Sequence, residues 1–189
     1  MCNDDASSPI ITNRTFLYNT ADGHGSGMSH GSPASPTITH TTLSYNTADG
    51  GGGMYNYESS SPIITNTIFW ENLKSNSNSL SGADIENSSS SSPTVSYCLT
   101  QANSVYDVAN NGTGIINNKD TLFVDALNGD FSLLCTSPAI NAGTTVTYTT
   151  DILGNPHVGT VDMGAYEYQG TSYNYTTAIY VDKSAIGNN

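Results

Sequence analysis

A serine followed by proline recurs at nearly even steps along the first half of the chain. The pair stands at Ser8-Pro9, Ser35-Pro36, Ser61-Pro62 and Ser92-Pro93, at steps of 27, 26 and 31 residues. Differences in length fall in Gly- and Ser-rich stretches between repeats, such as 50–53 and 75–81, and the residues around each proline keep their spacing. A chain with such a repeat is expected to fold as a stack of similar units.

Four sets of residues keep a fixed distance from proline. Eight residues before it stand Met1, Met28, Met54 and Ile85. Two residues after it stand Ile11, Ile38, Ile64 and Val95. Seven residues after it, the first three repeats carry Phe16, Leu43 and Phe69. Ten residues after it stand Asn19, Asn46, Asn72 and Asn103. We expect each set to form one vertical stack, because equivalent residues of successive coils lie above one another in a solenoid.

The repeat predicts an all-β fold, a right-handed parallel β-helix with coils of about 26 residues. Core strands must hold register from coil to coil, whereas an outward loop can lengthen freely. Leucine-rich repeats have a similar period but need their leucines and a helical side, which are missing. Abundant Asn, Thr and Gly also disfavour helices.

The fourth residue after proline marks a bend in each coil. The apolar residues at two and seven after proline are an odd number apart, so strict alternation must break between them. Asn13, His40, Asn66 and Tyr97 occupy this place, and Asn tolerates the left-handed conformation that a bend requires. If alternation resumes after the bend, Arg14 faces inward, where an unpaired charge is costly.

Longer motifs resemble known β-helix proteins. The stretch GGGMYN…SSPIITNTIFWEN is similar to parallel β-helix repeats of bacterial surfaces, including polymorphic outer-membrane repeats. The stretches DTLFVDALNGDFSLLCTSPAINAG and DILGNPHVGTVDMGAYEYQ are similar to the C-terminal end of β-helix domains in choice-of-anchor secreted proteins. The resemblance implies coils over 1–112 beginning in mid-coil, a last coil and irregular β capping segment over 113–169, and a linker with the first strand of a following domain over 170–189.

The same resemblance implies a secreted or cell-surface location in a bacterium. We expect the chain to be a segment of a longer protein, acting as a non-catalytic stalk, adhesin or passenger region. The alternative is a carbohydrate-active enzyme, a polysaccharide lyase or glycoside hydrolase, whose catalytic coils lie outside this segment. End-to-end self-association through open coil edges is a further expectation, since exposed strand edges pair readily.

Charge excludes one class of partner. The formal net charge is −12, with 4 Lys and Arg against 16 Asp and Glu. Nucleic-acid binding needs clustered cations, so we expect no nucleic-acid partner. No apolar run reaches the length of a membrane span, so no membrane insertion is expected in this segment. Cys2, Cys98 and Cys135 form no metal-binding spacing.

Two candidate binding sites follow from the repeats. Tyr18 and Tyr45 occupy the same position in successive coils, and Trp70 lies beside that position in the next. An aromatic stripe of this kind could bind surface glycans, although such rings also cover core edges. Asp22 and Asp49 match in the repeated Asn-Thr-Ala-Asp-Gly and are candidate Ca²⁺ ligands. We expect them instead to be solvated turn residues and expect no cofactor.

A third group is acidic and lies in the terminal segment, the name used here for the capping segment within 113–169. Its members are Asp125, Asp130, Asp151, Asp162 and Glu167. We expect them to serve the cap that closes the stack, rather than to bind calcium.

Overall fold

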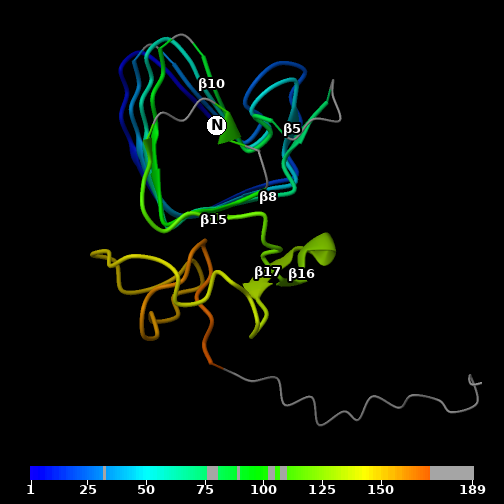
Figure 1. Cartoon of the computed structure of the whole chain (residues 1–189), viewed down its shortest axis with the longest axis vertical. Coiled ribbons are helices and arrows are strands. Elements are labelled where there is room, and N and C mark those ends of the chain that lie inside the picture. Colours follow the sequence, from blue (N-terminus) through cyan, green and yellow to red (C-terminus); the bar gives the residue numbers. More distant parts are fainter. Residues whose placement is uncertain (32, 76–80, 89, 102–104, 107–109, 171–189) are drawn as a thin grey trace, which may run out of the picture.

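The computed structural model describes residues 1–31, 33–75, 81–88, 90–101, 105–106 and 110–170. It confirms the predicted fold class: the described chain is nearly all β and forms a parallel β-solenoid of about three turns, with a spacing of about 27 residues. Figure 1 looks along the stack, so that the coils overlap as one ring. The first strand of a following domain, expected within 170–189, lies outside the described residues, which end at 170.

The first sheet forms one wall of the ring. Its strands run parallel in the order β1, β3, β6, β10 and β13. Their bounds are Cys2–Asn3, Met28–His30, Met54–Asn56, Ile85–Asn87 and Val105–Tyr106. In the three central strands the first and third residues are buried and the middle one is partly exposed, which gives this wall an inner and an outer face.

The second sheet forms the other two walls. Strands β2 (Ile10–Leu17) and β4 (Thr37–Ser44) run through both walls without a break. In the later coils one wall holds β7 (Ile63–Thr65), β11 (Thr94–Ser96) and β14 (Asn110–Asn111), and the other holds β8 (Ile68–Trp70), β12 (Leu99–Thr100) and β15 (Ile116–Asn117). A short parallel pair, β5 (Thr47–Ala48) with β9 (Leu73–Lys74), lies in the outward loops.

A left-handed residue turns the chain between these two walls. The corner residues have φ angles of 50°, 46°, 49° and 49° at Asn13, His40, Asn66 and Tyr97. This conformation interrupts the strand alternation, so the residues on its two sides lie on opposite faces of the sheet and the coil can bury apolar residues an odd number apart.

The apolar stacks hold the interior together. Ile11 pairs with Ile38, Ile38 with Ile64 and Ile64 with Val95. In the adjacent wall Phe16 pairs with Leu43 and Leu43 with Phe69. These seven residues belong to one core cluster, in which Phe16 is partly buried and the other six are buried.

Arg14 departs from its inward position. The equivalent residues of later coils, Thr41, Thr67 and Cys98, are buried, whereas Arg14 is exposed and its guanidinium donates to the backbone oxygen of Asn13 at 2.9 Å. Among the described residues the first coil has a neighbouring coil on one side only, so a long side chain can leave the interior and keep its charge in water.

The terminal segment packs on the side of the stack. It contains an antiparallel pair, β16 (Phe123–Asp125) and β17 (Asp130–Leu133), joined by the 3-10 turn η1 (Ala126–Asn128). Figure 1 shows it beneath the ring, beside β8 and β15. Its Leu133, Ala139 and Met163 form a second core cluster with Ile68 and Leu99 of the coils. The expectation that it closes the end of the stack is therefore corrected: it covers a side wall.

Candidate functional site

The tyrosines of the predicted aromatic stripe stack on each other and are partly covered. The rings of Tyr18 and Tyr45 lie 5.0 Å apart at 12°. Phe131 of the terminal segment meets both edge-on, at 6.1 and 6.3 Å. The Tyr18 hydroxyl also donates to the backbone oxygen of Ala126. The pair therefore helps to dock the terminal segment, while Tyr18 keeps 49% of its surface exposed.

Trp70 stands apart from this pair. The tyrosine position of its coil is held by Glu71, which has the same left-handed φ, 53°, as Tyr18 and Tyr45 at 55°. Trp70 is partly buried and packs against the second core cluster. The structure therefore brings two of the three predicted aromatic residues together and joins Phe131 to them.

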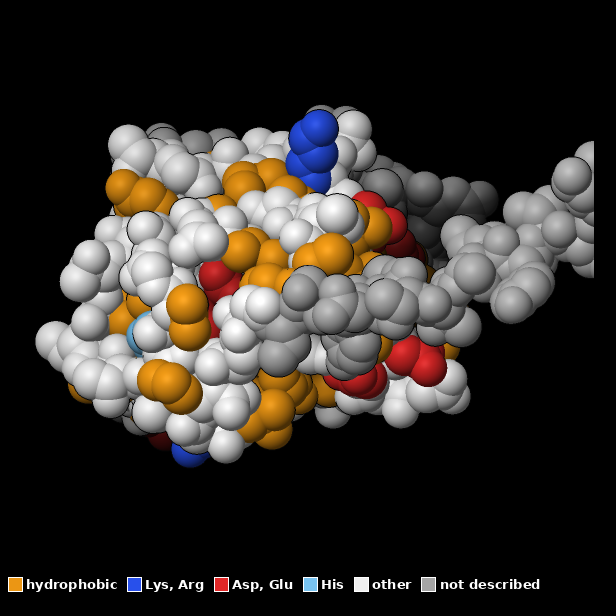
Figure 2. Space-filling view, turned by 90° about the horizontal axis from the view of Figure 1, so that it is seen from below, with side chains coloured by type: hydrophobic (Ala, Val, Ile, Leu, Met, Phe, Trp, Pro, Cys, Tyr) orange, Lys and Arg blue, Asp and Glu red, His pale blue; other side chains and the backbone are white. Residues whose placement is uncertain are grey.

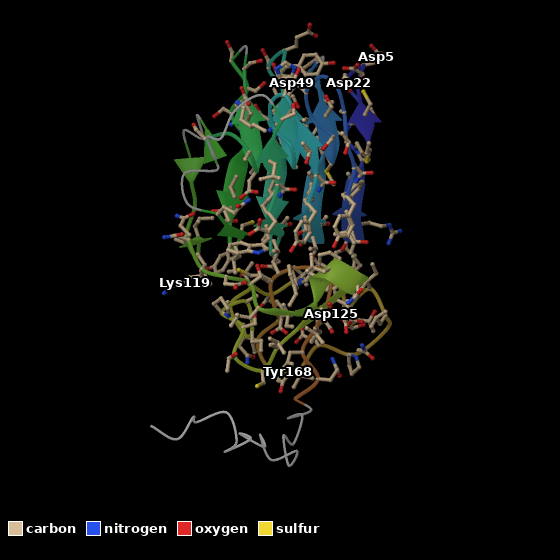
Figure 3. All side chains as sticks on the ribbon, turned by 90° about the vertical axis from the view of Figure 1, so that its right-hand side faces the viewer. Asp5, Asp22, Asp49, Lys119, Asp125 and Tyr168 are labelled. Carbon is tan, nitrogen blue, oxygen red and sulfur yellow. The ribbon has the colours of Figure 1, made fainter. Side chains whose placement is uncertain are left out.

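The predicted calcium ligands lie in neighbouring outward loops. Asp22 is exposed, and Asp49 accepts a hydrogen bond from the hydroxyl of Ser75 at 2.5 Å. Figure 3 labels both near Asp5, at the end of the molecule opposite Asp125 and Tyr168. Within the described residues no three or more His, Cys, Asp and Glu gather as a metal site would require.

A ladder of asparagine side chains runs through the coils. The backbone and side-chain nitrogens of Asn19 donate to Oδ1 of Asn46, at 3.1 and 2.8 Å. Those of Asn46 donate in the same way to Asn72, at 3.2 and 3.0 Å. Asn72 then donates to the buried Asp84 at 2.8 Å, and Gln101 donates to the same carboxylate. Asn103, the expected fourth member, lies outside the described residues.

The serine of each Ser-Pro pair forms a second ladder, which sequence reasoning missed. The backbone nitrogen of Ser35 donates to Oγ of Ser8, that of Ser61 to Ser35 and that of Ser92 to Ser61, at 3.2, 3.1 and 3.2 Å. These bonds run from a later coil to an earlier one, opposite to the asparagine ladder. The constant Ser before proline was the available signal.

A third polar column lies inside the first sheet, six residues before proline. Asn3, His30, Asn56 and Asn87 are its buried members. Asn56 donates to Oδ1 of Asn87 at 2.8 Å, whereas neither ring nitrogen of His30 nor the oxygen of Asn56 finds a partner among the described residues. Burial lowers the pKa of His30 to about 4, so the ring is neutral at physiological pH.

A second buried histidine joins the corner to the terminal segment. The ring of His40 stacks on that of His157, with centroids 5.3 Å apart. Its two nitrogens lie 3.2 Å from the side chains of Thr39 and Asn66. Burial, and to a smaller extent the nearby His157, lowers the pKa of His40 to about 4.

Three buried carboxylates organise the terminal segment. Asp151 accepts from the backbone nitrogens of Leu153 and Asn155, at 2.9 and 2.8 Å, and from that of Glu167 at 3.1 Å. Glu167 in turn accepts from the backbone nitrogens of Val158 and Asp162, at 2.8 and 3.0 Å.

Asp162 completes this group by accepting from the backbone nitrogens of Asn141 and Tyr168, at 2.7 and 2.6 Å. Burial raises its pKa to about 6, against the opposing effect of these two bonds. The three carboxylates thus replace a regular strand ladder as backbone acceptors. By contrast, Asp125 and Asp130 are exposed.

A shallow pocket of about 120 Å³ opens beside these carboxylates, between Leu133, Leu153 and Tyr168. Figure 2 views the molecule from this side and shows apolar side chains gathered near its centre, with acidic side chains beside them. The lining carboxylates of Asp151 and Glu167 already accept backbone hydrogen bonds. Their arrangement supports the local fold.

A further aromatic group lies on the outer face of the first sheet. The ring of Tyr55 lies 4.4 Å from that of His24 and 5.7 Å from that of Tyr57. Sequence reasoning missed this group because Tyr57 does not recur at the equivalent position of another described coil, and Tyr55 recurs only two coils later, where the register places Tyr106.

Comparison with known proteins gives no relatives. No family model matches the chain, and neither a curated protein nor a solved structure has a significant match. Among the described residues, no helix has the length and apolar character needed to cross a membrane.

Proposed function

We propose that this chain is a non-catalytic β-solenoid segment of a large secreted or cell-surface bacterial protein, in which it acts as a stalk, adhesin or passenger region. The observation that carries the proposal is the pair of side-chain ladders along the stack. The asparagine of one coil donates to the asparagine of the next coil. The serine hydroxyl of one coil accepts from the backbone nitrogen of the serine in the next coil. The location rests on the resemblance of the repeat to surface β-helix proteins.

The ladders suit a rigid spacer for a physical reason. Parallel strands already join the coils through their backbones, and the ladders add bonds at the strand ends, where a coil would otherwise open. Asn46 is buried and bonded to the coils on both sides. Separating two coils therefore requires breaking backbone and side-chain bonds together.

Stretching single molecules between the chain ends tests this role. We expect a rigid stack to open coil by coil. Each event should release about 27 residues, a contour length of roughly 100 Å at ~3.6 Å per residue. The variant Asn46→Ala should lower the force of the earliest events. Unfolding of the whole chain in one event at low force would contradict the proposal.

A separate assay tests the enzymatic alternative. The purified chain is incubated with neutral and acidic polysaccharides, and new reducing ends and unsaturated sugars are measured. We expect neither product. Release of either one, lost on substitution of an acidic residue of this chain, would place catalysis within this segment.

End-to-end self-association forms part of the same proposal. Within the described part of the chain, strands β1 and β2 each pair on one side only, with β3 and β4. Asn19 is the outermost member of its ladder, and its side-chain oxygen accepts no hydrogen bond from the described residues. A coil of a second copy that offers an amide donor to this oxygen would extend the asparagine ladder at this end. Light scattering over a range of concentrations tests it, and a mass that stays monomeric throughout would contradict it.

A further inference from the structure

The outer face of the first sheet carries an aromatic strip formed by Tyr55 and Tyr57, with His24 beside it. Both tyrosines belong to the same coil, in β6 and just after it. Their rings lie 5.7 Å apart at 24°, and His24 lies 4.4 Å from Tyr55. Both tyrosines are partly exposed and His24 is exposed. Rings so placed offer π surface to a ligand from solvent.

Tyr57 lies flat on the sheet. A Cβ atom built on Gly31 would stand 2.6 Å from each Cε carbon of Tyr57 and closer still to Cζ. Equal distances to the two edges of the ring mean that the ring covers Gly31 face-on. One face of the ring is therefore supported by glycine backbone, while the other is turned away from the sheet. A supported, outward ring face suits stacking against the C–H face of a sugar ring.

Polar groups stand at both ends of the strip. The Tyr57 hydroxyl donates to both carboxylate oxygens of Asp4, in the first coil, at 3.2 Å. The Tyr55 hydroxyl lies 2.9 Å from the hydroxyl of Ser88, after β10. The strip therefore runs along the solenoid axis from β1 to β10, crossing strands spaced by ~4.8 Å, close to the length of one pyranose unit.

Charge around the strip narrows the ligand class. Asp4, Glu58 and Glu86 lie on or beside it, and Lys74 is bonded to Glu86 at 2.8 Å. Figure 3 shows Asp5, which follows Asp4 in the chain, together with Asp22 and Asp49 at one end of the molecule. An anionic polysaccharide would approach carboxylates with no unpaired cation among these residues, so like-charge repulsion disfavours it. A neutral polysaccharide has hydroxyls for the carboxylates and flat C–H faces for the rings.

We propose that this strip binds a neutral polysaccharide chain lying along the solenoid axis. Successive sugar rings stack on Tyr57 and Tyr55, and their hydroxyls bond to Asp4 and Ser88 at the two ends. The site is distinct from the Tyr18 and Tyr45 pair, whose rings face Phe131 of the terminal segment. It goes beyond the spacer role, and either proposal can fail while the other stands.

Calorimetric titration of the whole chain with cellohexaose, xylohexaose, mannohexaose and chitohexaose tests the site. We expect at least one to bind, and hexagalacturonate to bind at least about tenfold more weakly than the best of them. The double variant Tyr55→Ala/Tyr57→Ala should lose at least about tenfold in affinity, because the stacking surface is gone. The matched variant Tyr55→Phe/Tyr57→Phe keeps the rings and should stay within about threefold.

Two further variants make the test independent of folding. Gly31→Ala places a methyl group under Tyr57 and should weaken binding by lifting the ring, even where the alanine double variant fails to fold. Tyr18→Ala should bind as the parent chain does. Absence of binding by all four neutral hexasaccharides at millimolar concentration would overturn the proposal. Equal binding by the parent and the folded Tyr55→Ala/Tyr57→Ala variant would also overturn it.

Discussion

The coils and the terminal segment satisfy their backbone groups in different ways. In the coils each strand pairs with the same strand of the next coil, and a repeated side chain closes the ladder at its ends. The terminal segment has one short antiparallel pair, and it directs backbone nitrogens onto the buried carboxylates of Asp151, Asp162 and Glu167. Both arrangements thus provide backbone nitrogens with acceptors.

This difference sets how stability is distributed. The coils spread their bonds over many equivalent residues, so a change in one coil is shared with two neighbours. The terminal segment concentrates them in three side chains, each of which accepts at least two backbone bonds. Loss of one carboxylate should therefore open the terminal segment locally, whereas damage to a coil should spread.

The largest effect is expected from Ile38→Asp. Ile38 is fully buried and pairs with Ile11 and Ile64, so an unpaired carboxylate would be placed between coils. We expect a loss of at least about 4 kcal/mol of unfolding free energy. Chemical denaturation followed by circular dichroism measures it. A variant that unfolds at the same denaturant concentration as the parent would refute the proposed coil register.

Asp151→Ala should have a smaller and local effect. It removes the acceptor of three backbone nitrogens, and we expect a loss of about 2–4 kcal/mol. Hydrogen exchange should quicken in residues 150–168 while the coil strands keep their protection. The exposed Asp125→Ala, which loses one bond to Asn128, is the control. Equal deprotection of the coils would show that the two regions unfold as one.

Asn46→Ala tests the ladder inside the coils. The substitution removes the acceptor of the Asn19 nitrogens and the donor to the backbone oxygen of Phe16. We expect a loss of about 2–3 kcal/mol, because buried polar groups are left unpaired. Asn128→Ala, at an exposed position, should cost much less. If both variants lose the same small amount, the ladder does not stabilise the stack.

The two regions should respond to pH with opposite signs. In the coils the pKa values of His30 and His40 are lowered to about 4. The unfolded chain then binds protons below about 6.5 while the folded chain does not, so stability falls as pH drops from about 6.5 to about 4. His30→Asn should flatten this fall by up to about 1.4 kcal/mol per pH unit.

His30→Asn should also stabilise the chain at pH 7 by about 1 kcal/mol, because the new amide can donate to Oδ1 of Asn56. In the terminal segment the pKa of Asp162 is raised to about 6. Its contribution is present below about pH 4 and is lost as pH rises through about 6, so Asp162→Asn should steepen the acid-side fall. An unchanged pH profile in both variants would contradict this assignment.

The smallest effect is expected from calcium removal. Asp22 is exposed and Asp49 is engaged by Ser75, which is typical of loop residues rather than of a filled site. EDTA should therefore shift the melting temperature little or not at all. A large drop that added Ca²⁺ reverses would assign the cation site to these loops.

The sequence is informative where residues repeat. Ile11, Ile38 and Ile64 have a fixed distance from proline, and the strands pair in that register. The corner at Asn13 and His40 follows from the odd spacing of inward residues. A repeated position is constrained by its own copies above and below, so a single sequence already contains the comparison that locates it.

The remainder depends on contacts that do not repeat. Asn66 binds the backbone of Thr144 in both directions, at 2.8 Å each, and this docks the terminal segment on a side wall. No pattern in the sequence connects residues 78 positions apart. Likewise Tyr57 has Gly31 and Asp4 at the equivalent positions of other coils, so periodicity gave no reason to examine it.

The opposed direction of the two ladders has a consequence for how such a protein can change its length during evolution. On one face a coil has the asparagine nitrogens as donors and the serine hydroxyl as acceptor. On its other face it has the asparagine side-chain oxygen as acceptor and the serine backbone nitrogen as donor, so any two coils match. Duplication of one whole coil would therefore keep the existing contacts and add one complete rung to each ladder. Duplication of part of a coil would break both ladders. The gene can lengthen in whole repeats, while sequence between repeats is free to drift.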